Sequence, residues 1–129
     1  MGKIEKFEDI EMWQTARSLV LFIYRQTSRK PFSIDYGLKD QIQRAAVSVM
    51  SNIVEGFERG GNKEFLQFLY IAKASSAEVK SLSYVAFDLG YIDEESFNII
   101  QNETTSVSRQ ISGLVKYLKN SHLKGLKNV

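Results

Sequence analysis

Residues 97–118, FNIIQNETTSVSRQISGLVKYL, contain the most regular hydrophobic pattern of this chain. Apolar or small side chains recur there in alternating steps of three and four residues, the spacing that places them on one face of an α-helix. They are Phe97, Ile100, Thr104, Val107, Ile111, Leu114 and Leu118. The stretch therefore predicts a long amphipathic helix, because the apolar residues of a half-buried strand would instead alternate.

Three further segments with the same spacing precede this one, and residues that end helices separate them. These residues are Pro31 and Gly37, then Gly56, Gly60 and Gly61, then Gly90. We therefore predict helices over residues 8–29, 38–58, 62–89 and 93–121. Long helices joined by short loops pack as antiparallel neighbours by default. The predicted fold is all-α, an up-down antiparallel four-helix bundle.

The length and composition favour one folded domain over residues 1–129. A chain of 129 residues has the usual size of one domain, about 100–200 residues. Hydrophobic residues make up 43% of the chain and charged residues 25%, as in soluble globular proteins. The longest apolar run, residues 19–24, is too short to span a bilayer. We expect a cytoplasmic protein with no membrane association.

Local signals mark the helix ends. Asn62 and Asp93 each precede an apolar periodic run and can accept hydrogen bonds from the free amides of a first turn. Asp9 or Glu8 is expected to do the same for the first helix. Gly113 lies inside the fourth predicted helix, where glycine costs about 1 kcal/mol relative to alanine. It indicates either a close helix contact or a local kink.

The residue inventory argues against an enzyme. The chain has no cysteine, and its single histidine is His122, so thiolate chemistry, histidine-ligated zinc and general-base histidine catalysis lack their residues. Neither Glu55 nor Glu78 is followed by a histidine three residues later, as a carboxylate di-metal bundle requires. No glycine-rich phosphate loop is present. We expect no catalytic residue, no cofactor, no metal and no small-molecule substrate.

Two predicted helices carry more apolar side chains than one core-facing stripe needs. These extra residues are Leu66, Tyr70, Ala77, Tyr84 and Phe87 on residues 62–89, and Leu19, Leu21 and Phe22 on residues 8–29. They indicate either a wide core-facing sector or a subunit interface. We favour the interface, because a contiguous exposed apolar patch on a small protein usually marks a contact. The protein is therefore expected to be a homo-oligomer.

A polar row runs along residues 38–58 beside the apolar one, and comprises Gln41, Arg44, Ser48, Ser51, Asn52 and Glu55. Residues 38–58 and 62–89 form a hairpin, so the numbers of facing residues sum to about 120. This rule predicts an interhelical ion pair between Arg44 and Glu78. The polar row is either a structural network that fixes helix register or subunit contacts, or part of a binding site together with Arg59.

Basic residues form two groups around the first and second connections. Net charge is only +2, from 17 basic and 15 acidic residues, and neither requires nor excludes a polyanionic partner. Each group is either a solvated helix end or a phosphate-binding patch that gains avidity when a symmetric oligomer repeats it. The candidate contacts to RNA or DNA are Arg29, Lys30, Arg59 and Lys63, with Phe32 and Tyr36 as the aromatic residues available for base stacking.

The run YGLKDQIQRAAVSVMSNIVEG, residues 36–56, resembles the signature of the four-helix bundle proteins encoded by intervening sequences in bacterial 23S ribosomal RNA genes. Residues 7–10, 13–16, 64–65, 68–69, 74–78 and 89–92 also match, so the resemblance spans residues 7–118. Six polar residues match characteristic positions of this family: Gln41, Arg44, Ser48, Asn52, Glu55 and Glu78. The resemblance implies that they serve fold and assembly.

The same resemblance implies a small up-down bundle that assembles into a ring, with a pentamer favoured, and implies no catalytic residues. A related branch, the accessory subunit of reverse transcriptases in diversity-generating retroelements, resembles a nucleic-acid-binding pentamer with basic residues on its barrel. This chain departs from that branch in its near-neutral charge. The leading hypothesis is a non-enzymatic homo-oligomer that binds RNA or DNA weakly through repeated basic surfaces. The alternative is a protein-interaction scaffold with no nucleic-acid role.

Overall fold

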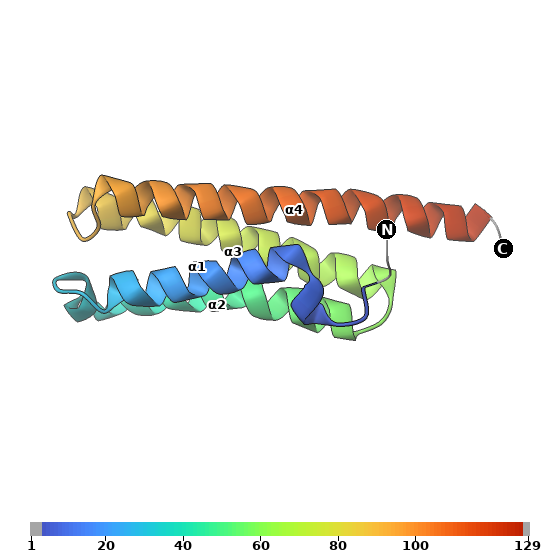
Figure 1. The fold of residues 1–129 in the computed structure, drawn as a ribbon, viewed down its shortest axis with the longest axis horizontal. Coiled ribbons are helices and arrows are strands. Elements are labelled where there is room, and N and C mark those ends of the chain that lie inside the picture. Colours follow the sequence, from blue (N-terminus) through green and yellow to red (C-terminus); the bar gives the residue numbers. More distant parts are fainter. Residues whose placement is uncertain (1–3, 128–129) are drawn as a thin grey trace.

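The computed structural model describes the backbone of residues 4–127 and the side chains of residues 4–120. This part of the chain contains four long helices, α1 (Glu11–Thr27), α2 (Tyr36–Glu58), α3 (Asn62–Asp88) and α4 (Glu94–Lys127). Two 3-10 turns, Phe7–Asp9 and Phe32–Ile34, precede α1 and α2. Successive helices run antiparallel side by side, and α4 also contacts α1 (Figure 1). The predicted up-down four-helix bundle is confirmed.

The core consists of two apolar clusters stacked along the bundle axis. One contains Ile53, Leu69 and Val107, and the other contains Ile23, Ile42 and Ile100. Between them lies a polar layer in which the buried Ser76 hydroxyl donates a 3.0 Å hydrogen bond to the backbone carbonyl of Thr104. Since both residues are at most 1% exposed, this bond fixes the register of α3 against α4 inside the core.

Two caps define where α2 and α4 begin. Asp93 accepts a 2.8 Å hydrogen bond from the amide of Ser96, which confirms it as the cap of α4. Asp35 caps α2 through a 3.2 Å hydrogen bond from the amide of Leu38, so α2 begins at Tyr36, two residues earlier than predicted.

The other predicted caps are wrong. Asn62 is the first residue of α3, and the capping position belongs to Gly61, which has no side chain to donate or accept. Glu8 and Asp9 lie in a 3-10 turn before α1, and the residue at the cap position of α1 is Ile10. The turn instead meets α1 through the side chain of Gln14, which donates a 2.8 Å hydrogen bond to the backbone carbonyl of Glu8.

Two glycines inside helices have opposite surroundings. A Cβ atom on Gly56 would lie 2.8 Å from Cβ of Phe68 and 2.9 Å from Cδ1 of Phe65, so the absence of a side chain there lets α2 and α3 approach closely. A Cβ atom on Gly113 would have no neighbour within 4 Å, and α4 continues unbroken past it. The two predicted reasons for a glycine at position 113, a close helix contact and a local kink, are therefore both absent within residues 4–120.

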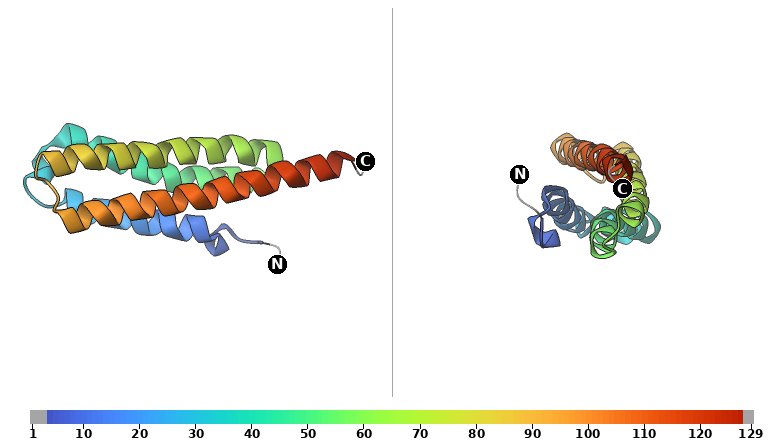
Figure 2. Two further views of the ribbon diagram at one scale, coloured as in Figure 1. Left: turned by 90° about the horizontal axis from the view of Figure 1, so that it is seen from above. Right: turned by 90° about the vertical axis from the view of Figure 1, so that its right-hand side faces the viewer.

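The carboxyl-terminal end of α4 extends beyond the α2–α3 turn, on the side of the bundle where the amino terminus lies (Figure 2). The opposite end of the bundle is formed by the α1–α2 and α3–α4 connections (Figure 1). Within residues 4–127, none of the helices combines the length and the apolar character needed to cross a membrane.

Candidate functional site

The polar row of α2 forms hydrogen bonds both to α3 and within α2. Gln41 Nε2 donates a 3.4 Å hydrogen bond to Oε2 of Glu78, and the hydroxyls of Ser48 and Ser75 lie 2.7 Å apart. Nδ2 of Asn52 donates to the backbone carbonyl and the hydroxyl of Ser48, at 2.8 and 2.9 Å. The Gln41–Glu78 and Ser48–Ser75 bonds join α2 to α3 at fixed positions, which favours one register of the two helices, whereas the Asn52–Ser48 bonds lie within α2.

The predicted ion pair between Arg44 and Glu78 is wrong. No ion pair joins these two exposed residues, both of which lie within the described side chains, and Gln41 occupies the position facing Glu78. Arg44 lies on the next turn of α2, and its side chain is exposed. Glu55 forms its ion pair locally: Oε1 of its carboxylate lies 2.7 Å from the guanidinium of Arg59, the residue that follows α2.

The four basic residues proposed for nucleic-acid contact fall into two separate groups. Arg29 and Lys30 lie in the α1–α2 connection, whereas Arg59 and Lys63 lie at the α2–α3 turn. The 23 residues of α2 separate these ends by about 35 Å, so the groups form no single site on one chain. Their contact with nucleic acid stays a prediction.

Acidic and aromatic neighbours weaken these groups as phosphate sites. Hydrogen bonds from Ser96 lower the pKa of Asp93, and the charge of Arg29 lowers it further, so a carboxylate already lies near Arg29. The guanidinium of Arg59 is paired with Glu55 and lies 5.2 Å from the ring of Phe68. The proposed stacking role of Phe32 is wrong, because this ring is 1% exposed and belongs to the core.

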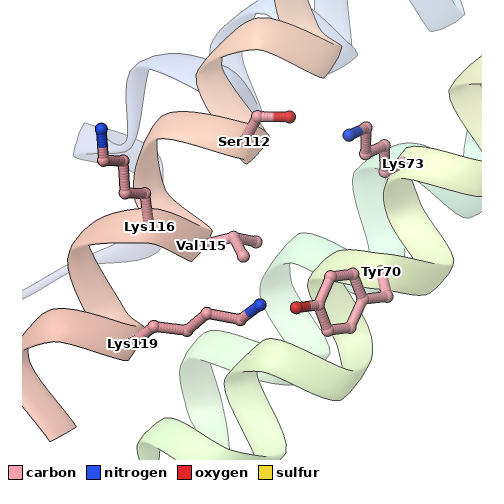
Figure 3. A pocket seen from close by; sticks show the side chains of 6 residues that line it. All are labelled: Tyr70, Lys73, Ser112, Val115, Lys116 and Lys119. Atoms are coloured by element: carbon pink, nitrogen blue, oxygen red, sulfur yellow. The ribbon is translucent and has the colours of Figure 1, made fainter. Parts of the chain in front are cut away.

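A hollow of about 230 Å³ between α3 and α4 gathers lysines that are not among the predicted nucleic-acid contacts. We call it the lysine groove, and its lining residues are Tyr70, Lys73, Ser112, Val115, Lys116 and Lys119. In Figure 3 the ammonium of Lys119 points toward the hydroxyl of Tyr70, and Lys73 and Ser112 point toward one another across the hollow. The ammonium of Lys116 points outward.

The lysine groove has a positive electrostatic character. None of its six lining residues is acidic, and α4 carries no acidic residue from Thr104 to Asn120. Glu78, the acidic residue in the middle of α3, bonds to Gln41 on the α2 side of that helix. The nitrogen of Lys119 lies 5.7 Å from the ring centroid of Tyr70, within reach of a cation–π interaction. The lysine charges are therefore not neutralised by carboxylates lining the hollow.

Direct contacts close the rest of the α3–α4 boundary. Nζ of Lys80 donates to the hydroxyl of Thr105 at 3.0 Å, and Nε2 of Gln101 donates to the hydroxyl of Ser83 at 2.8 Å. Nearer the α3–α4 connection, Tyr84 and Phe87 pack against Phe97, with ring centroids 4.9 and 4.8 Å apart. The hollow is therefore confined to the part of the boundary nearest the amino-terminal half of α3.

The predicted extra apolar residues differ in their surroundings, and Leu21 and Ala77 are exposed. Leu19 is fully buried and Leu66 packs against the core, while Tyr84 and Phe87 contact Phe97. Tyr70 belongs to the lysine groove. A further exposed set, which we call the outward apolar row, comprises Ile71 and Val85 on α3 and Leu89 directly after it, which are 48%, 43% and 55% exposed. The predicted extra stripe was thus only partly a free surface.

A second, shallow groove between α1 and α4 is polar. Its lining residues are Glu11, Gln14, Thr15, Ser18, Asn102, Glu103 and Ser106. The Ser18 hydroxyl donates a 3.3 Å hydrogen bond to Oε1 of Glu103, and Oε2 of this carboxylate is buried without a partner among the described atoms. Burial raises the pKa of Glu103, and the hydrogen bond from Ser18 partly offsets this shift. Among the described side chains, residues 4–120, no three histidine, aspartate or glutamate residues gather into a metal site.

Sequence analysis missed the lysine groove because it joins residues about 45 positions apart, which meet only when α3 and α4 pack antiparallel. Two signals pointed to it. Tyr70 and Lys73 share a face of α3 at i, i+3 spacing, as do Ser112, Val115, Lys116 and Lys119 on α4. The second signal is the absence of acidic residues in α4 after Glu103.

These features define a class of protein, an all-α up-down bundle with polar interhelical bonds and a basic groove between its last two helices. Residues 8–113 match the family model of the 23S rRNA-intervening sequence protein, and the chain belongs to this family. The resemblance seen in residues 36–56 is thereby confirmed.

One similar crystal structure is that of a protein with unknown function from the S23 ribosomal protein family of Bacteroides thetaiotaomicron VPI-5482. The two chains are 19% identical and superpose with a TM-score of 0.74, over 81% of this chain and 98% of that one. At this identity the likeness concerns the fold alone. No curated protein matches the chain.

Proposed function

We propose that the protein is a non-enzymatic homo-oligomer that binds RNA or DNA through basic grooves repeated on its subunits. The observation that carries this proposal is the lysine groove, whose lining contains Lys73, Lys116, Lys119 and a half-exposed tyrosine, Tyr70, but no carboxylate. Lysines bind phosphates and release their counterions, independently of base sequence. One groove supplies only a few such contacts, so binding by a single subunit is weak and repetition in an oligomer raises it.

The outward apolar row supports the oligomer. Ile71, Val85 and Leu89 are large and exposed, and a second copy of the chain is the proposed cover. Ile71 follows Tyr70 directly, which places it about 100° further round the helix. The contact therefore leaves the lysine groove open. The family resemblance favours five subunits.

Binding to a fluorescent oligonucleotide across a salt titration tests the proposal. The variant Lys73→Ala/Lys116→Ala/Lys119→Ala removes the groove charges, and Arg17→Ala/Arg25→Ala/Arg44→Ala, at exposed residues outside the groove, is its control. Each variant changes net charge by three, from +2 to −1, at different places. The groove variant is expected to lose at least about tenfold in affinity and to reduce the salt slope by about two to three, whereas the control changes affinity much less.

Equal losses in both variants would show that overall charge, not the groove, governs binding. A wild-type oligomer that binds neither RNA nor DNA at low salt would overturn the nucleic-acid proposal. The alternative, a protein-interaction scaffold, would then be favoured, with the outward apolar row as its contact surface.

A further inference from the structure

We infer that the lysine groove holds an unpaired nucleobase against the ring of Tyr70, so that the protein selects single-stranded over duplex nucleic acid. This inference rests on the nucleic-acid binding proposed above and adds which form of nucleic acid the groove takes. It is carried by the combination of an aromatic wall, an apolar floor and a lysine rim in one hollow.

The hollow has more apolar surface than a phosphate site needs. Tyr70 is 46% exposed and forms one wall, while Val115 is only 9% exposed and forms part of the floor. A phosphate group gains nothing from such surfaces, since charged oxygens prefer ammonium groups and water. A nucleobase has flat faces that stack on an aromatic ring and polar edges that accept hydrogen bonds. The lining fits a base in the hollow and phosphates at the lysine rim.

The directions of the side chains suit a base inside the hollow and phosphates at its rim. Lys73 and Ser112 point toward one another across the hollow, so an ammonium and a hydroxyl flank the space and can bond the edge of a base (Figure 3). The ammonium of Lys116 points outward, where it can meet the phosphate backbone (Figure 3). Lys119 lies 5.7 Å from the Tyr70 ring centroid and holds a positive charge beside the ring.

Only an unpaired strand can use the aromatic wall. In a duplex the faces of the bases are stacked on one another and the phosphates form the outer surface, so Tyr70 has no base face to contact without opening the helix. The lysines alone would contact single strands and duplexes through the same phosphates. Selection between the two forms must therefore depend on Tyr70. Because every base has such faces, the groove is expected to tolerate many sequences.

The test compares a fluorescein-labelled 12-nucleotide oligouridylate with a 12-base-pair RNA duplex at one salt concentration, using the full chain. Tyr70→Ala is expected to weaken single-strand binding about tenfold and to change duplex binding less than about twofold, because one base–aromatic stack is lost. Tyr70→Phe keeps the ring and should keep the selectivity. Tyr24→Ala is the matched control, since Tyr24 is 45% exposed, much as Tyr70 is, but lies on α1 outside the groove.

A second measurement does not depend on any variant. Irradiation of the wild-type protein with a 4-thiouridine oligonucleotide is expected to crosslink the peptide that contains Tyr70. Crosslinks confined to other peptides would contradict the inference.

The two proposals fail differently. If the lysine variant weakens both nucleic acids but Tyr70→Ala weakens neither or both equally, the stacking inference is overturned and the nucleic-acid proposal stands. If the wild-type protein binds neither probe, the nucleic-acid proposal itself fails. Circular dichroism and oligomeric mass of each variant establish that a loss of binding is not a loss of folding.

Discussion

The hydroxyl of Tyr91 donates a 2.9 Å hydrogen bond to Oδ2 of Asp35, while Oδ1 of the same carboxylate accepts from the amide of Leu38. The two residues are 56 positions apart and lie in the α3–α4 and α1–α2 connections. The ring of Tyr91 also lies 5.2 Å from the ring of Phe32. One carboxylate thus caps α2 and ties together the two connections at this end of the bundle.

Asp35→Ala is expected to lower the free energy of unfolding by more than Tyr91→Phe, because only the first change removes the cap. Loss of the cap alone costs about 1 kcal/mol. Urea denaturation of both single variants and of the double variant measures this. The double variant should be no less stable than Asp35→Ala, since the shared hydrogen bond is lost only once. Fully additive losses would contradict the proposed coupling.

The same bond predicts a pH dependence above pH 10. The hydrogen bond to Asp35 raises the pKa of Tyr91 from its ordinary value of 10.0, with smaller contributions from burial and from the charge of Asp35. The folded state therefore keeps this proton at pH values where the unfolded state loses it. The stabilisation is complete below pH 10 and is lost as the pH rises through the folded pKa. Tyr91→Phe should flatten this alkaline part of the stability profile, and an unchanged profile would contradict the assignment.

Glu103→Gln is expected to stabilise the protein at neutral pH. Burial raises the pKa of Glu103 above its ordinary value of 4.5, so the folded state favours the protonated side chain. The stability contribution of that proton is full below pH 4.5 and is lost as the pH rises through the folded pKa. Glutamine keeps an acceptor for Ser18 and stays neutral.

Urea denaturation at several pH values between 4 and 7 measures the effect of Glu103→Gln. Water in the shallow groove screens the charge, so the gain at pH 7 is less than about 1 kcal/mol. Glu11→Gln is the control, because Glu11 lines the same groove but is exposed. A loss of stability at pH 7 in Glu103→Gln would show that the carboxylate has a cationic partner.

The same substitution at two glycines is expected to have opposite effects. Gly113→Ala should raise the free energy of unfolding by about 1 kcal/mol, since a Cβ atom there meets no neighbour. Gly56→Ala should lower it by about 1–3 kcal/mol, because its Cβ atom would overlap Phe68 and Phe65. Thermal and urea denaturation measure both. If Gly113→Ala instead destabilises the assembled protein, the glycine lies at a contact between copies.

Helical periodicity predicted the bundle because it is a local property of the sequence. Ile100, Thr104, Val107, Ile111 and Leu118 are buried as expected, since each needs only the preceding turns to define its face. Leu114 is only partly buried, and the neighbouring Val115 is buried instead. Features that depend on rotation about a helix were harder to predict. The hairpin rule correctly predicted which part of α2 lies opposite Glu78. It named Arg44 as the partner, whereas the residue that bonds to Glu78 is Gln41, one turn earlier on α2.

The lysine groove and the Tyr91–Asp35 bond could not be predicted from any one segment. Each joins residues from two elements distant in sequence, and their proximity depends on how the helices are stacked. Caps were intermediate in difficulty. Asp93 was predicted correctly because it directly precedes α4. Asn62 was predicted as a cap, but it is the first residue of α3, and Gly61 takes the capping position.

The outward apolar row gives a final prediction about assembly. Ile71→Glu and Val85→Glu place a charge on the proposed subunit contact, and burial of an unpaired carboxylate there would be costly. Sedimentation should therefore show dissociation into folded monomers, with the helical content of the wild type. Both side chains are largely exposed within one chain, so the stability of the monomer should change by less than about 0.5 kcal/mol. Val47→Glu is the control, since Val47 is 39% exposed on α2 and should leave the oligomer intact. Oligomers that persist in both α3 variants would place the contact elsewhere, and a monomeric wild type would overturn the proposed assembly.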